Sequence, residues 1–129
     1  MKIILNIVFF ITTTLVSAQS DTINWKGYFS YFKVQQIVKG QNNLIVAAEN
    51  SFFSYDTTTN LTTKISTVEG LSGDEISTIY QAQDSNLIFI GYNNGLIQIY
   101  NTRTNNIKVV VDILEKQTIS PDQKQINQF

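Results

Sequence analysis

An internal repeat of about 43 to 45 residues constrains this chain more than any other feature. Residues 43–48 (NLIVAA) match residues 86–91 (NLIFIG), and residues 56–60 (DTTTN) match residues 101–105 (NTRTN). The first pair of segments starts 43 residues apart and the second pair 45, which indicates a small insertion in a turn. A period of this size is typical of a β-propeller, in which each blade is a sheet of four antiparallel strands. The repeat therefore predicts an all-β fold.

Each repeat contains four short apolar segments separated by polar turn residues, which is the pattern of short β-strands. The second segment of each repeat is apolar at consecutive positions, so we expect an inner strand that is covered on both faces. Asn94-Gly95 predicts a two-residue hairpin of type I′, and Ser51 at the matching place indicates a different turn in the first repeat. The expected strands are 34–39, 44–49, 52–55 and 64–67 in the first repeat, and 76–81, 87–92, 96–100 and 107–112 in the second.

The repeats predict how the chain is divided. Blade one covers about residues 34–67 and blade two about 76–112, and a third blade begins at about 120–129. A closed propeller typically has four to eight blades, whereas about two and a half are encoded here. We therefore expect residues 19–129 to be the N-terminal part of an incomplete propeller domain, and the chain to be a fragment.

The first 18 residues have the features of a signal peptide. Lys2 supplies a positive charge, residues 3–16 are mostly apolar, and small residues precede a cleavage site between Ala18 and Gln19. The apolar run is too short for a membrane span, which needs about 20 apolar residues. We therefore expect export, with no transmembrane segment in the mature chain.

Composition excludes several classes of function. The chain has no histidine and no cysteine, so it cannot build a Ser-His-Asp or a Cys-His site, nor a disulfide. Its formal net charge is −1 and its nine Lys and Arg residues form no cluster, so nucleic acid is not an expected partner.

Three features could form a site, but each is expected to have a structural role. Acidic Glu69, Asp74 and Glu75 are expected to lie in a solvated loop rather than to act as acid and base. Residues 56–60 carry two potential Ca²⁺ ligands but lack the ligand spacing of a calcium loop, so a polar hairpin tip is expected. No catalytic, cofactor-binding or metal-binding residue is therefore predicted. An aromatic cluster is expected to pack in the fold rather than to bind a ligand; it comprises Trp25, Tyr28, Phe29, Tyr31 and Phe32.

Several segments resemble known propellers. Residues 70–79 (GLSGDEISTI), 87–91 (LIFIG) and 94–96 (NGL) resemble the repeat of two-component-regulator propellers. Residues 25–31 (WKGYFSY) and 46–56 (VAAENSFFSYD) are more similar to the PorZ-like first propeller of Bacteroidota, which belongs to the type IX secretion system.

The resemblance implies a non-catalytic scaffold or binding module, not an enzyme, that needs no cofactor and works in the periplasm or at the outer-membrane cell surface. It implies other type IX secretion components as partners, and lipopolysaccharide as a ligand of a longer protein with a second propeller and a sorting domain. One alternative is the extracytoplasmic sensor propeller of a hybrid two-component histidine kinase. The other is a propeller hydrolase or lyase whose chemistry lies in further blades.

Overall fold

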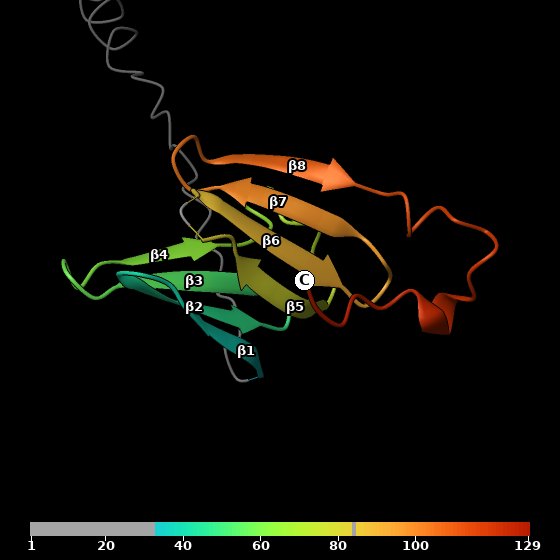
Figure 1. Ribbon diagram of the computed structural model, residues 1–129, viewed down its shortest axis with the longest axis horizontal. Helices are drawn as coiled ribbons and strands as arrows, with labels where there is room; N and C mark the ends of the chain where they lie inside the picture. The colour runs from blue at the N-terminus through green and yellow to red at the C-terminus, as the bar shows by residue number, and fades with distance from the viewer. Residues whose placement is uncertain (1–32, 84) are drawn as a thin grey trace, which may run out of the picture.

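Eight strands form two four-stranded antiparallel sheets in the computed structural model, which describes residues 33–83 and 85–129 (Figure 1). In both sheets the strands lie side by side in chain order. The two sheets confirm the predicted all-β fold with four-stranded blades. The first sheet comprises β1 (Val34–Lys39), β2 (Asn43–Ala48), β3 (Ser51–Asp56) and β4 (Thr62–Ile65), and the second comprises β5 (Ile76–Gln81), β6 (Leu87–Tyr92), β7 (Ile97–Asn101) and β8 (Asn106–Val110).

The predicted fourth strand at 64–67 is displaced, because β4 ends at Ile65. The chain turns at Ser66, whose carbonyl oxygen accepts hydrogen bonds from the N–H groups of Glu69 (3.1 Å) and Leu71 (3.0 Å). These bonds use the carbonyl of Ser66 within the turn, so the strand cannot continue to residue 67.

The register of the strands corrects the alignment of the repeats. Leu44 of β2 pairs with Tyr55, and Ile88 of β6 pairs with Tyr100. The equivalent residues of β2 and β6 are therefore 44 positions apart, and the match at 43 is wrong by one residue. A shift of one residue exchanges the two faces of a strand.

The stacking of the two sheets explains why β2 and β6 bury opposite faces. In β2 the fully buried Ile45 lies on the face that packs against the second sheet, and in β6 the fully buried Ile88 lies on the face that packs against the first. Stacked sheets meet through opposite faces, so these two isoleucines are not equivalent positions. The residue equivalent to Ile45 is Phe89, which is only half-buried.

The insertion between the repeats lies in the second hairpin. Gly95 N–H donates to the carbonyl of Tyr92 (3.2 Å), and Tyr92 N–H donates to the carbonyl of Leu96 (3.1 Å). Gly95 has a φ of 89°, whereas Asn94 is not among the described residues with positive φ. The loop is therefore a three-residue turn with glycine in its left-handed last position, and the type I′ prediction is wrong.

The corresponding hairpin of the first sheet is one residue shorter. Ala48 pairs directly with Ser51, which leaves Glu49 and Asn50 as the loop. None of these residues is among those with positive φ. The expectation of a different turn at Ser51 is confirmed.

The tips of the β3–β4 and β7–β8 hairpins repeat the same hydrogen bonds. Asp56 Oδ1 accepts from the N–H groups of Thr58 and Thr59, both at 2.8 Å. Asn101 Oδ1 accepts in the same way from residues 103 and 104, at 2.9 and 3.1 Å. The two backbone N–H groups lower the pKa of Asp56. The predicted polar hairpin tip is confirmed.

The repeat suggests a matched pair of substitutions at this tip. We expect Asp56→Ala to lower the midpoint of urea denaturation, because two N–H groups lose their acceptor, and Asp56→Asn to retain most of the stability because Asn101 makes the same bonds. Urea titrations followed by circular dichroism measure both. A Ca²⁺-dependent rise in the wild-type midpoint that is lost in Asp56→Asn would contradict a purely structural tip.

The core lies between the two sheets, where apolar side chains from both are buried in one cluster. At its centre the ring of Phe52 on β3 meets that of Tyr100 on β7 edge to face, with centroids 5.7 Å apart. The fully buried members of this cluster are Ile45, Ala47, Phe52, Ile76, Ile88, Ile90 and Tyr92.

The first strands of the sheets are tied together by a side chain. Gln36 Oε1 of β1 accepts from Ile79 N–H (2.8 Å) and from Thr78 Oγ1 (3.1 Å), both on β5.

The last residues of the chain pack against β5 and β6. Ser77 Oγ donates to the carbonyl of Ile126 at 2.6 Å. Residues 121–123 form a short 3-10 helix, and no strand is assigned between residues 120 and 129.

Candidate functional site

The three acidic residues that are close in sequence have different partners in the structure. Glu69 Oε2 accepts from the N–H (2.7 Å) and hydroxyl (2.6 Å) of Ser66 and so stabilises the turn after β4. Asp74 donates a hydrogen bond from its backbone N–H to Ser72 Oγ at 3.2 Å. Glu75 belongs to a separate network. The arrangement does not place two of these carboxylates on either side of a common pocket.

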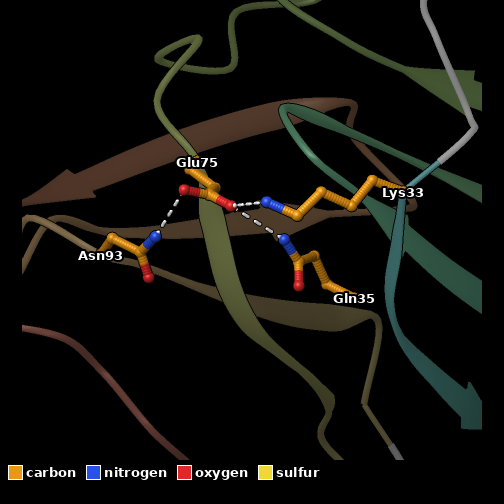
Figure 2. A network of polar contacts seen from close by, with 4 residues as sticks. All are labelled: Lys33, Gln35, Glu75 and Asn93. Atoms are coloured by element: carbon orange, nitrogen blue, oxygen red, sulfur yellow. Dashed lines mark hydrogen bonds and ion pairs between the residues drawn. The ribbon is translucent and has the colours of Figure 1, made fainter.

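The Glu75 network joins the two sheets (Figure 2). Lys33 Nζ lies 2.6 Å from Glu75 Oε1, and Gln35 Nε2 donates to the same oxygen at 3.0 Å. Asn93 Nδ2 donates to Glu75 Oε2 at 2.8 Å. Both oxygens of the carboxylate are therefore occupied by donors that come from the start of β1 and from the β6–β7 turn.

These contacts set the protonation of the network. The hydrogen bond and the charge of Lys33 lower the pKa of Glu75, with smaller contributions from Asn93 and Gln35. The same ion pair raises the pKa of Lys33. A carboxylate held in its ionised form by three donors is a poor general acid, so the network is a structural clasp between the sheets.

The clasp predicts a specific dependence of stability on pH. Because the pKa of Glu75 is lowered in the folded state, its stabilisation is present above its unfolded pKa of about 4.3 and is lost as pH falls through the folded value. We therefore expect the urea midpoint to fall more steeply between about pH 6 and pH 3 in the wild type than in Glu75→Gln.

Asp74→Asn is the matched control for this experiment, because it removes a charge from the neighbouring position and leaves the clasp intact. Its pH profile should resemble that of the wild type. High salt should reduce the difference in urea midpoint between wild type and Glu75→Gln, because Lys33 and Glu75 are both exposed and salt screens their attraction. Parallel profiles for wild type and Glu75→Gln would contradict a stabilising clasp.

A buried polar group fixes the link between the sheets. Gln98 of β7 accepts from Ser72 N–H (3.1 Å) and from the Tyr92 hydroxyl through its Oε1 atom, and its Nε2 donates to the carbonyl of Gly70 (3.2 Å). Burial raises the pKa of Tyr92 to about 12. The phenol therefore remains protonated as a hydrogen-bond donor, which is a structural role rather than that of a general base.

A pocket of about 330 Å³ lies beside the first strands of the two sheets. We call it the first-strand pocket. Its walls come from β1, β5 and the last three residues, and none of its lining side chains is charged. They are Gln35, Gln36, Ser77, Thr78, Ile79, Tyr80, Asn127, Gln128 and Phe129.

A larger cleft of about 1400 Å³ opens between the sheets, near the β1–β2 and β3–β4 turns and their counterparts in the second sheet. Its apolar floor includes the ring pair Phe52 and Tyr100 of the core, and Leu61 at 67% exposure lines it as well. The rim is formed mainly by amide and hydroxyl side chains. Because core residues form the floor, the cleft is the place where the two stacked sheets move apart at one end.

The sequence predicted no functional role for the residues of the first-strand pocket. Gln35 and Ser77 are 42 positions apart, and no local pattern indicates that they line a common pocket. Within residues 33–83 and 85–129 no group of three or more His, Cys, Asp or Glu could hold a metal ion. No helix in the same part of the chain is long and apolar enough to cross a membrane. The predicted cleavage site at Ala18 and Gln19, and the aromatic cluster from Trp25 to Phe32, lie outside the described residues.

Comparison with solved structures finds eight similar chains. Two of them are the N-terminal domain of Nup159 and a chain of the S. cerevisiae complex of dbp5 with nup159, gle1, ip6 and adp. Each has a TM-score of 0.48 and 12% identity, and each alignment covers 67% of this chain. The chain spans only 22% of the length of either solved chain.

Comparison with curated proteins finds no significant match. Comparison with protein families matches residues 44–129, two thirds of the sequence, to the family described as "TSS9, PorZ, N-terminal beta-propeller domain". The matched residues run from Leu44 in β2 to the end of the chain, so the match covers the whole second sheet and most of the first, without β1. This chain therefore belongs to the PorZ N-terminal β-propeller family.

Proposed function

We propose that this chain serves as a non-catalytic scaffold or binding module of the type IX secretion system. The observation that carries the proposal is the family match over residues 44–129. The chemistry of the described residues is consistent with it, because Glu69 and Glu75 are held by structural hydrogen bonds. The proposed partners are other secretion components and, through a longer protein, lipopolysaccharide.

The proposal includes export and a particular domain organisation. The leader would be removed between Ala18 and Gln19, and the mature chain would act in the periplasm or at the outer-membrane surface. Blade one at about 34–67, blade two at about 76–112 and the start of blade three at about 120–129 would belong to one propeller. Ile37, an apolar side chain at 63% exposure, lies on the face of the first sheet that points away from the second, which is consistent with a surface that a further blade would cover.

Deletion and complementation in the native cell test this function. Deletion is expected to block secretion of type IX substrates, and the wild-type gene should restore it. Glu75→Gln should restore secretion as well, because the clasp is structural rather than catalytic. Unchanged secretion in the deletion strain would contradict the proposal, and so would loss of secretion with a stably folded Glu75→Gln variant.

The exported protein provides a second measurement. Mass spectrometry of its amino terminus should identify Gln19 as the first residue. A mature protein that retains residues 3–16 would contradict the signal-peptide prediction. Affinity isolation of the exported protein should recover type IX secretion components.

A further inference from the structure

The outer edge of β4 is an open edge of the first sheet. β4 is the last strand of that sheet, and no strand pairs with its far side in the part of the chain that the structure describes (Figure 1). The residues Thr62, Thr63 and Lys64 of this strand are exposed, and only Ile65 is buried. The backbone groups on such an edge can pair with another extended chain.

The register of the β3–β4 hairpin shows which backbone groups point outwards. Asp56 N–H donates to the carbonyl of Leu61 at 2.9 Å, so these two residues form a hydrogen-bonded pair. Bonded and non-bonded pairs alternate along an antiparallel ladder, and Thr62 and Lys64 therefore occupy non-bonded positions. Their N–H and C=O groups point away from β3, so each of these residues offers one donor and one acceptor at the edge.

The two faces of the sheet differ beside this edge. Lys64 lies on the face that points away from the second sheet, because alternate residues of a strand point to opposite faces. Leu61 is apolar and 67% exposed on the cleft side. The edge strand β8 contributes no residue to the large cleft, whereas three side chains of the β4 segment line it, namely Leu61, Thr63 and Ile65.

These features select an extended polypeptide as the ligand. A peptide backbone pairs with alternating N–H and C=O groups along an edge, as in β-strand addition. In an added strand, the side chains beside Thr63 and Ile65 point towards the large cleft, whose apolar floor favours apolar residues. The side chain beside Lys64 lies on the other face, where the lysine attracts a carboxylate and repels a cation.

We propose that the outer edge of β4 binds an extended peptide segment in which an acidic residue is flanked by apolar residues. The peptide adds a strand to the first sheet beside β4. Further blades would stack on the faces of the sheets, so this edge stays accessible in a larger propeller. The proposal deepens the proposed function, on which its biological setting rests, by naming a class of partner.

Titration of the purified full chain with blocked synthetic peptides tests the edge. The probe is Thr-Val-Glu-Val-Thr-Val, whose length is that of a typical strand, and the control peptide has Lys in place of Glu. We expect the acidic probe to bind with a Kd of about 1 mM or below and to shift the N–H signals of Thr62 and Lys64 in NMR spectra. The lysine peptide should bind about fivefold more weakly, with a smaller difference at high salt.

Three substitutions locate the binding. Lys64→Glu should reverse the preference, so that the lysine peptide binds more tightly than the acidic probe. Lys108→Glu is the matched control, because it makes the same change of charge on β8, the edge strand of the second sheet, and it should leave both affinities unchanged. Thr62→Pro removes an outward N–H and keeps the β3–β4 bonds, so it should weaken binding of the probe by about tenfold or more while circular dichroism stays unchanged.

Four results would overturn the inference. The first is that neither peptide binds, and the second is a preference for the acidic probe that Lys64→Glu does not change. The third is a preference that only Lys108→Glu removes, which would assign the binding to β8. The fourth is self-association that Thr62→Pro abolishes while no peptide binds, which would assign the edge to a second copy of the chain. If the probe binds but deletion leaves secretion unchanged, only the proposed function fails.

Discussion

Replacement of Phe52 with alanine is expected to lower the free energy of unfolding by about 3 to 5 kcal/mol. Phe52 is fully buried between the sheets, and its ring packs edge to face on Tyr100 at 5.7 Å. The substitution removes contacts of both sheets at once and enlarges the space between them. Urea denaturation followed by circular dichroism measures the loss.

Leu61→Ala is the control for this substitution, because Leu61 is an apolar residue at 67% exposure. Its effect on the free energy of unfolding should remain within about 0.5 kcal/mol. A loss below about 1 kcal/mol for Phe52→Ala would mean that the two sheets do not depend on a shared core.

The second large effect is expected at Gly95. Its φ of 89° costs a residue with a side chain about 1 to 2 kcal/mol. A Cβ atom there would also lie 2.9 Å from Ile113 Cγ2 and 3.1 Å from the backbone oxygen of Lys124. Crowding of this kind adds about 1 to 3 kcal/mol, so Gly95→Ala should be the more damaging of two glycine substitutions.

Gly73→Ala separates the cost of a positive φ from the cost of crowding around the added Cβ atom. Gly73 has a similar φ of 85°, but a Cβ atom there would meet only Thr67 Cγ2, at 3.2 Å. The difference in unfolding free energy between the two variants therefore measures the packing of residues 111–125 on the β6–β7 turn. Gly95→Ala should also make this segment easier to cleave with protease. Equal losses in both variants, with unchanged cleavage, would show that the segment does not depend on the turn.

The sequence by itself was sufficient to predict the strands, because their signals are local. Apolar runs and turn residues identified β1, β5 and β6 with the bounds that the structure has. The match between residues 56–60 and 101–105 is also present in the structure, because the side chain at the start of each segment accepts hydrogen bonds from the N–H groups two and three residues later. Such contacts do not depend on the rest of the fold.

Only the tertiary structure determines which face of each strand packs against the other sheet. The strands β2 and β6 are apolar on both faces, so apolar residues match at an offset of 43 or 44, and the identical Asn-Leu-Ile at 43 favoured the wrong one. Only the stacking of the sheets shows that Ile45 and Ile88 lie on opposite faces. The turn at Gly95 was ambiguous for a related reason, because Asn-Gly fits both a two-residue and a three-residue loop.

The clasp and the first-strand pocket could be found only from the tertiary structure. Lys33 and Glu75 are 42 residues apart, and the walls of the pocket come from three segments that are distant in sequence. Neither feature has a local pattern, because each arises where the ends and edges of separate sheets meet. Sequence periodicity specifies which residues form a strand, whereas the side chains that meet between sheets depend on how the sheets stack.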